Sequence, residues 1–461
     1  MRQKILAILL LGAVLLTGCS AGTIGEKDAA AAASAAQPVT AGAPAAEANR
    51  REPVVDEATG KIKLTLAGMR MDGAGWKQLA EDFNAQSDSY IVELKDYYTG
   101  DESSDLADLE QMYADVMDAK TRLNTELIAG KLPDMLAFDN LSPLPYIGKD
   151  LLLDLGPYLE ADGTLSADDL LCWDALHEYG GLYILGQHFY VDTLACSQEF
   201  YAAHKGWTLA DYLEIEKGLR DDQQMIYYMS QEEFLTQMGG RYLTRALDLE
   251  HGTCDFENAE FIGLLDAVRT AGQYELSEEV ETPTAKQMQT GRLMCCAEWL
   301  DAPSQVAIDR NDGGQQLAYI GWPTVDGSCG SVVNLSGTIS AFATTCSPEG
   351  CWAFIQYVVT HASDAVFAGF GSPLYRPLLQ KAVEEWNADP LLAPEIRVTE
   401  EDLTVYLDAV NAAPALAFTD ESVMQIIREE CAPLLRGEGT AEDAARRIQS
   451  RASLYMTEQY G

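Results

Sequence analysis

The stretch Leu127-Ile128-Ala129-Gly130-Lys131-Leu132-Pro133-Asp134-Met135 marks a change from helix to strand. Apolar residues recur at helical spacing before it, Gly130 is a typical helix stop, and Pro133 prevents the helix from continuing. The apolar run Met135-Leu136-Ala137-Phe138 then predicts a buried strand. A helix therefore ends and a strand begins within this one stretch.

Two earlier segments complete the pattern on the N-terminal side. Residues 62–67 and 90–94 are rich in β-prone residues, and an amphipathic segment with Trp76 and Phe83 at helical spacing lies between them. The order strand, helix, strand, helix, strand predicts an α/β fold with a mainly parallel sheet and helices on both faces.

Ligands of such sheets bind beyond the carboxyl ends of the strands. This rule points to Arg70 and Asp72 after the first strand, and to Asp139 and Asn140 after the third. These side chains suit a site for hydroxyl groups, but they are equally consistent with solvated turns. The guanidinium of Arg70 could instead bind a carboxylate or phosphate bidentately, so an anionic solute stays open.

Composition limits the classes of function. The chain has 461 residues, 47% of them hydrophobic, which exceeds the usual size of one core and predicts two lobes. The formal net charge of −41 argues against binding nucleic acid or an anionic membrane surface through a basic face.

The N-terminus predicts export. Arg2 and Lys4 precede an apolar run over 5–16 that is too short to span a membrane, as in a signal peptide. The run ends in Leu16-Thr17-Gly18-Cys19, which resembles a bacterial lipobox. We expect a lipoprotein signal peptide over 1–18, a diacylglycerol group on Cys19, and a flexible tether over 19–58, because that segment is rich in alanine and poor in large apolar residues.

Cysteine usage indicates neither a disulfide framework nor a metal site. With Cys19 lipidated, nine of the ten cysteines remain, an odd number without a CxxC pair. Only five histidines are present, and none lies near a cysteine pair at metal-ligand spacing, so we expect no metal and no cofactor. We expect mostly buried free thiols, with several disulfides as the alternative.

Residues 127–135 resemble the helix-to-strand signature of the family 1 extracellular solute-binding proteins, which include maltose-binding protein. Further segments resemble that family in the same order: 151–159, 181–186, 207–212, 289–294, 335–340, 348–355 and the last helix, which Thr440 would cap. One departure is Cys196-Ser197, which stands where the family usually has tyrosine and asparagine. The resemblance covers essentially the whole chain after the tether.

The resemblance implies a two-lobed periplasmic-binding-protein-like α/β fold, with mixed sheets flanked by helices and a ligand cleft between the lobes. We expect one lobe over 59–188 plus 338–378 and the other over 189–337 plus 379–461. It also implies a monomeric substrate-binding lipoprotein of an ABC importer, anchored on the extracytoplasmic face of the cell membrane, that delivers a small solute to permease subunits.

A carbohydrate is the expected solute, because sugars need aromatic rings for stacking and polar groups for hydrogen bonds. Segments between residues 187 and 336 resemble those that line the family's cleft. The candidate ligand-binding residues in them are Gln187, His188, Tyr190, Trp299, Asp301, Trp322 and Ser336. Core packing is the alternative for both tryptophans.

Two other functions compete with transport. A surface sensor that presents its ligand to a signalling partner would use the same fold. A secreted hydrolase is the second rival, but no Gly-x-Ser-x-Gly elbow, HExxH motif or phosphate-binding loop is present, so we expect no enzymatic activity.

Overall fold

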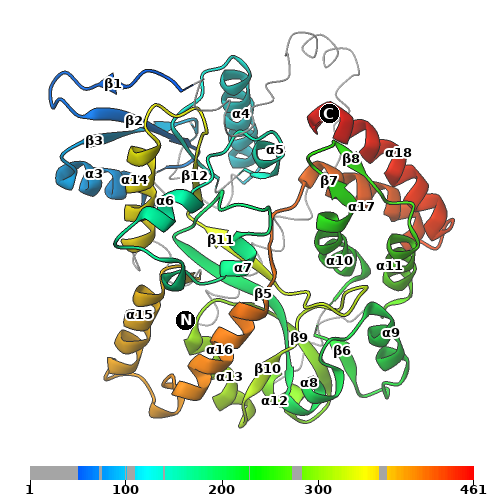
Figure 1. Ribbon diagram of the computed structural model, residues 1–461. Coiled ribbons are helices and arrows are strands. Elements are labelled where there is room, and N and C mark those ends of the chain that lie inside the picture. The colour runs from blue at the N-terminus through cyan, green and yellow to red at the C-terminus, as the bar shows by residue number, and fades with distance from the viewer. Residues whose placement is uncertain are drawn as a thin grey trace. The chain divides into compact units, whose positions relative to one another are not determined.

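Asp134, in the stretch that joins helix to strand, is the meeting point of four segments. The computed structural model describes residues 50–71, 75–98, 100, 109–138, 141–227, 229–272, 283–362 and 371–460 (Figure 1). In it the buried Asp134 carboxylate accepts hydrogen bonds from the backbone N–H of Thr65 (2.9 Å), the Thr345 hydroxyl (2.9 Å) and the backbone N–H of Cys346 (3.2 Å). Arg51 forms an ion pair with it at 2.6 Å. A buried charge is tolerated when it is paired and hydrogen-bonded in this way.

The first sheet confirms the predicted order of elements. Its strands are β1 (Val54–Val55), β2 (Ile62–Gly68), β3 (Tyr90–Asp96), β4 (Met135–Ala137) and β12 (Ile339–Ala341). β2 lies parallel to both β3 and β4, whereas β1 and β12 are antiparallel to their neighbours. The predicted helices are α3 (Trp76–Gln86) and α4 (Leu109–Ile128), and α4 ends before Gly130, whose φ of 73° suits a residue without a side chain.

The second sheet is built around one long strand, β5 (His188–Ser197). β9 (Leu293–Leu300), β10 (Leu317–Tyr319), β11 (Val332–Ser336) and β13 (Ser372–Pro373) all pair with β5 in antiparallel register. β6 (Gln224–Ile226) runs parallel to β9, and β14 (Ala415–Leu416) runs parallel to β11. A separate two-stranded hairpin consists of β7 (Leu247–Asp248) and β8 (Thr253–Cys254).

Helices surround both sheets (Figure 1). The remaining ones are α5 (Leu144–Ile147), α6 (Gly156–Ala161), η3 (Ala167–Asp169), α7 (Trp173–Leu176), α8 (Gln198–His204), α9 (Leu209–Lys217), α10 (Gln231–Ala246), α11 (Ala259–Thr270), α12 (Thr284–Gln289), α13 (Pro303–Gly313), α14 (Pro348–Thr360), α15 (Arg376–Ala388), η4 (Pro394–Ile396), α16 (Glu400–Ala412), α17 (Glu421–Leu435) and α18 (Ala441–Tyr460). Thr440 caps α18 as predicted, because its hydroxyl accepts from the backbone N–H of Asp443 at 3.2 Å.

Each face of the first sheet has its own apolar cover. Leu64 and Leu66 pack with residues of α3 and α14, including Phe83 and Phe354, whose rings meet edge to face at 5.1 Å. The opposite face packs against α4 and α5, where Leu123 is fully buried. A further core lies among α10, α11, α17 and α18 beside the second sheet.

The chain passes from one sheet to the other where two segments lie side by side. Gln187, just before β5, donates its backbone N–H to the carbonyls of Ser336 (3.0 Å) and Gly337 (3.2 Å). β11 ends at Ser336 and β12 of the first sheet begins at Ile339, so the return passage runs through Gly337, whose φ is 60°. A side chain at Gly337 would meet the Gln187 amide at 2.6 Å, which explains why the turn uses glycine.

Contacts with the sheet begin before the expected end of the tether at residue 58. Arg51 binds Asp134, and Val54 and Val55 pair with Lys63 and Ile62. This strand was not predicted, because a pattern of burial marks predictable strands whereas both valines here are exposed and are held by backbone pairing. The predicted signal peptide over 1–18 and Cys19 lie outside the described residues. The described residues all belong to one compact unit of the chain, Thr40–Gly461. Within the described part of the chain, no helix is long and apolar enough to cross a membrane.

Candidate functional site

One face of β5 carries polar and aromatic groups that are partly open to solvent. Phe189, Val191 and Thr193 are fully buried, whereas Tyr190 and Asp192, which alternate with them, are only partly buried. Since successive side chains of a strand point to opposite faces, Tyr190 and Asp192 share the open face. Their cross-strand partners Asn334 on β11 and Trp299 on β9 lie on the same face, and so does Ser336, which pairs with His188.

Trp299 is the most accessible of these groups. The residue is 44% exposed although β9 has a neighbouring strand on each side, and its indole ring lies 5.8 Å from the ring of Tyr190 at an angle of 42°. Burial, together with the nearby charge of Asp192, raises the pKa of Tyr190 to about 12, so its hydroxyl stays protonated and able to donate. An exposed indole with a neighbouring phenol is a surface on which an apolar ring face can stack.

The hydrogen bond and the ion pair of the Asp192 side chain both involve the same carboxylate oxygen. Its Oδ1 accepts a hydrogen bond from Trp322 Nε1 at 2.9 Å and lies 3.0 Å from Nη2 of Arg241. No described residue donates to Oδ2, which leaves that oxygen able to accept a hydrogen bond from a solute. Asp192 lies directly across from Trp299, so an acceptor and a stacking ring stand beside each other.

Arg241 contacts both Asp192 and Trp322 and so helps to hold the Asp192 carboxylate in place. It reaches Asp192 from α10, donates to the carbonyl of Gly330 at 2.6 Å, and lies over the Trp322 ring at 5.0 Å. Its side chain is 11% exposed and that of Asp192 13%, so the pair is largely removed from water and is neutral as a unit.

A second polar group lies where the chain crosses between the sheets. The hydroxyl oxygen of Ser336 is buried and has no hydrogen-bond partner among the described residues. Buried hydroxyls are normally satisfied by protein, water or ligand. Gln187 and His188 are almost fully buried beside it, and Gln187 packs against Gly337.

Comparisons with known proteins agree with this architecture. One solved structure of similar fold is a family 1 extracellular solute-binding protein from Alicyclobacillus acidocaldarius. It superposes with a TM-score of 0.50 at 14% identity, covering 86% of this chain and 98% of that one. The sugar-binding protein MalE from Xanthomonas citri superposes with a TM-score of 0.51 at 14% identity, covering 86% of this chain and 97% of that one. No family model matches the sequence, and no curated protein sequence matches it significantly.

The chain has the fold of the family 1 extracellular solute-binding proteins. The expectation of a mixed α/β, two-lobed architecture is therefore confirmed. The individual ligand-binding residues and the lobe boundaries stay predictions.

Within this solute-binding-protein fold, Arg70 lies at the end of β2 in the first sheet. Its guanidinium lies 5.5 Å from the centre of the Tyr98 ring, and its backbone N–H donates to Asp96 Oδ1 at 3.1 Å. Asp96 also accepts from the backbone N–H groups of Met71 and Tyr98, which fixes this loop. Asp72, Asp139 and Asn140, predicted for the same edge, lie outside the described residues.

Two further predicted residues, Trp322 and Asp301, do not share the exposed position of Trp299. Trp322 is fully buried in the core, so its ring has no open face for a sugar, and its contribution is the hydrogen bond to Asp192. Asp301 follows β9, and its charge acts on Glu298 and Asp309, which belong to the opposite side of the sheet. Burial raises the pKa of Asp301 to about 6.

Asp192, Arg241 and Asn334 were not predicted from the sequence. A usable signal for Asp192 was the alternation along β5, which places it two positions from Tyr190 and therefore on the same face. Arg241 gave no signal, because it reaches the site from a helix distant in sequence.

The cysteines and possible metal ligands add no further site. All nine cysteines of the described residues are free and six of them are buried, as the preferred interpretation expected. No group of three or more histidine, cysteine or acidic side chains in the described ranges could hold a metal ion.

Proposed function

We propose that this chain is the substrate-binding lipoprotein of an ABC importer and that it captures a neutral polyhydroxylated solute, a mono- or oligosaccharide, outside the cell. The observation that carries the proposal is the pairing of the half-exposed Trp299 ring with the one-sided Asp192 carboxylate on the same face of the second sheet. A sugar ring offers an apolar face to the indole and hydroxyl donors to Oδ2.

The charge balance favours a neutral solute over an anion. Asp192 is compensated by Arg241, so the face presents an acceptor without a free positive charge among its described residues. Arg70, which left an anionic solute open, follows β2 in the first sheet, and its guanidinium lies 5.5 Å from the centre of the Tyr98 ring. The MalE relative is named as a sugar-binding protein, which supports the same solute class.

Binding is favoured over glycoside hydrolysis by the same residues. Hydrolysis uses a pair of carboxyl groups on either side of the scissile bond. Among the described residues of this face, Asp192 is the one carboxylate, and the acidic residues Glu298 and Asp309 lie on the other side of the sheet.

Export and anchoring rest on the N-terminal sequence. The lipobox-like Leu16-Thr17-Gly18-Cys19 supports acylation at Cys19, and the delivery of solute to permease subunits follows from the importer assignment. Labelled fatty acid should be incorporated by the wild-type chain in a bacterial host and not by Cys19→Ser.

A thermal-shift screen of the chain without its leader tests the solute class. Saccharides, sugar acids, amino acids and polyamines are compared, since a ligand that binds only the folded state must raise the midpoint. A concentration-dependent shift with saccharides, lost in Trp299→Ala, supports the proposal. Shifts with sugar acids alone would reassign the solute to anions, and shifts with polyamines alone would make Asp192 a cation ligand.

A further inference from the structure

Acidic groups gather on the second sheet on the side away from Trp299. Glu298 of β9 lies opposite Thr193, and Tyr319 of β10 lies opposite Ala195, so both side chains are on the same face of β5. Helix α13, which carries Asp309, packs against β9 and β10.

Several polar atoms of this cluster have no partner among the described residues. They are Asp309 Oδ2, the Tyr319 hydroxyl oxygen, and both the nitrogen and the oxygen of the Gln316 side-chain amide. Tyr319 is only 9% exposed, and the acidic residues that influence its pKa most are Asp309 and Glu298. The other oxygen of Asp309 accepts from Gln305 Nε2 at 2.9 Å. The unpartnered Tyr319 hydroxyl therefore stands in the same polar interior as the two carboxyl groups.

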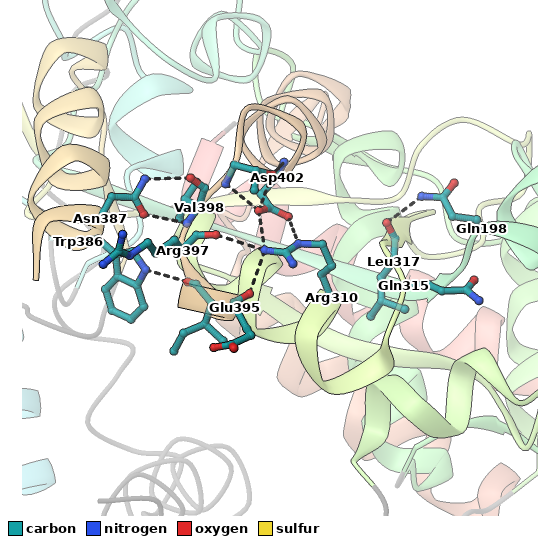
Figure 2. A network of polar contacts seen from close by, with 12 residues as sticks. Gln198, Arg310, Gln315, Leu317, Trp386, Asn387, Glu395, Arg397, Val398 and Asp402 are labelled. Carbon is teal, nitrogen blue, oxygen red and sulfur yellow. Dashed lines mark hydrogen bonds and ion pairs between the residues drawn. The ribbon is translucent and has the colours of Figure 1, made fainter. Parts of the chain in front are cut away.

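The cation next to Asp309 on α13, Arg310, is paired with a different carboxylate, that of Asp402. Arg310 follows Asp309 in sequence, but its guanidinium is directed to Asp402 of α16, at 2.8 and 3.1 Å, and to the carbonyls of Glu395 and Arg397, each at 3.2 Å (Figure 2). Asp402 is fully buried and its pKa is lowered by this pairing and by hydrogen bonds from Thr399, against the effect of burial.

In the described part of the chain, no cation of the other elements packed around α13 is paired with Glu298 or Asp309, and Lys381 of α15 is paired with Glu385. Lys286 of α12 is exposed, and Arg376 of α15 donates to the carbonyl of Asp168. The remaining titratable neighbours are Asp301 after β9, Asp312 on α13 and Tyr406 on α16. None of these carries a positive charge.

Burial and mutual repulsion therefore favour the protonated acids. Burial first, and then the charges of Asp309 and Asp301, raise the pKa of Glu298 well above its usual value. Burial, with Asp312 and Asp301 nearby, raises the pKa of Asp309 to about 7. Two neighbouring carboxyl groups without a cation cannot both ionise easily, and their titrations belong to the pair.

We propose that the cluster of Glu298 and Asp309, in which Asp309 Oδ2 is buried without a donor, holds a proton at neutral pH, and that losing it in mildly alkaline solution loosens α13 from β9 and changes the environment of Trp299. Glu298 and Trp299 are adjacent in β9 and point to opposite faces, so a shift of this strand is transmitted directly to the indole. The device is independent of which solute, if any, the open face binds. A shared metal ion is the alternative occupant, although no group of three candidate ligands gathers in the described residues.

The test compares the wild-type chain with Glu298→Gln, Asp309→Asn and the double variant from pH 5 to 9. Glu384→Gln serves as the control, since Glu384 is an exposed acid on α15. Because the folded state holds the proton more tightly, wild-type stability should fall as pH rises through the folded pKa values. The urea midpoint of the double variant should rise relative to wild type with increasing pH, and that of Glu384→Gln should follow wild type.

Acrylamide quenching of tryptophan fluorescence gives a second measurement on folded protein. The difference in quenching between wild type and Trp299→Phe isolates the signal of Trp299. It should change with pH in the wild type and stay constant in Glu298→Gln. The proposal is overturned if the amide variants track wild type in both measurements, or if they are destabilised equally at every pH. Stabilisation of wild type by millimolar calcium that is lost in the double variant would overturn it in favour of a metal ion.

Discussion

The indole N–H of Trp322 donates to Oδ1 of Asp192 at 2.9 Å across 130 positions of sequence. Trp322 is fully buried, whereas Asp192 lies on the open face of β5, so the bond joins the core to the candidate site. Arg241 contacts both residues, through an ion pair to Asp192 and a cation–π contact with the Trp322 ring. The orientation of the carboxylate is thus set by groups that a solute does not touch.

Replacing Trp322 with phenylalanine tests this arrangement. The ring is largely kept but the donor to Asp192 is lost, and we expect a loss of about 1–3 kcal/mol in the free energy of unfolding. Solute affinity should fall with it, because Asp192 loses one of the two groups that orient it. Trp299→Phe is the matched control and should leave the free energy of unfolding within about 0.5 kcal/mol of wild type, as usual for a surface change. Urea titration measures both, and equal effects would argue against a special role for Trp322.

The ion pair of Asp192 and Arg241 should behave as a coupled unit. Asp192→Asn leaves the guanidinium without its counterion, at a cost of about 3 kcal/mol for a largely buried pair. Adding Arg241→Met should cost less than the sum of the single changes, with a coupling of about 0.5–3 kcal/mol. A double-mutant cycle by chemical unfolding gives this value, and strictly additive effects would contradict the coupling.

The sequence predicted the first sheet well because its signals are local. The glycine stop, the proline and the apolar runs each act within a few residues, and β2, β3 and β4 have the predicted order and parallel direction. The pairing of Trp299 with Asp192 and of Asn334 with Tyr190 depends on register between strands distant in sequence, which no local pattern encodes. Tyr190 and Trp299 were predicted through resemblance, whereas Asp192, one position away from two fully buried neighbours, was not.

Trp322 and Asp301 differ from Trp299 in their placement for a common physical reason. Trp322 and Asp301 both follow the end of a strand, where alternation no longer fixes the direction of a side chain. Gly321, with a φ of 77°, turns the chain so that Trp322 enters the core. Both residues were assigned to the site from their position along the chain, and the turn that decides their direction has no apolar periodicity.

Asp134 should be one of the most sensitive positions for stability. Asp134→Ala removes the acceptor of two backbone N–H groups, one hydroxyl and Arg51, and we expect a loss of about 3–5 kcal/mol in the free energy of unfolding. Thr345→Val removes only one of these donors and should cost about 1 kcal/mol. Equal costs in chemical unfolding would show that the carboxylate does not join the four segments.

Glu178 should make stability depend on pH at a place distant from the acidic cluster of α13. Its carboxylate accepts from the backbone N–H of Leu416 at 2.9 Å, yet burial raises its pKa to about 7. A raised folded pKa contributes stability that is greatest below the unfolded pKa of about 4.3 and is lost as pH rises through 7. Glu178→Gln keeps an acceptor for Leu416 and cannot ionise, so it should be more stable than wild type at pH 8 by about 3 kcal/mol and nearly equal at pH 4. A constant difference between the two variants across this range would show that Glu178 ionises normally.

Trp299 offers the most direct separation of function from folding. The residue is 44% exposed, so Trp299→Ala should change the free energy of unfolding by less than about 1 kcal/mol. An aromatic stacking contact contributes about 1.5 kcal/mol, and 1.4 kcal/mol corresponds to tenfold in affinity, so the dissociation constant for a saccharide should rise about tenfold or more. Tyr190→Phe keeps the neighbouring ring and removes only its hydroxyl, so a smaller loss of affinity there would assign the main contribution to stacking. Isothermal titration calorimetry with a saccharide identified by the screen measures both changes, and an unaltered affinity in Trp299→Ala would place the solute elsewhere on the protein.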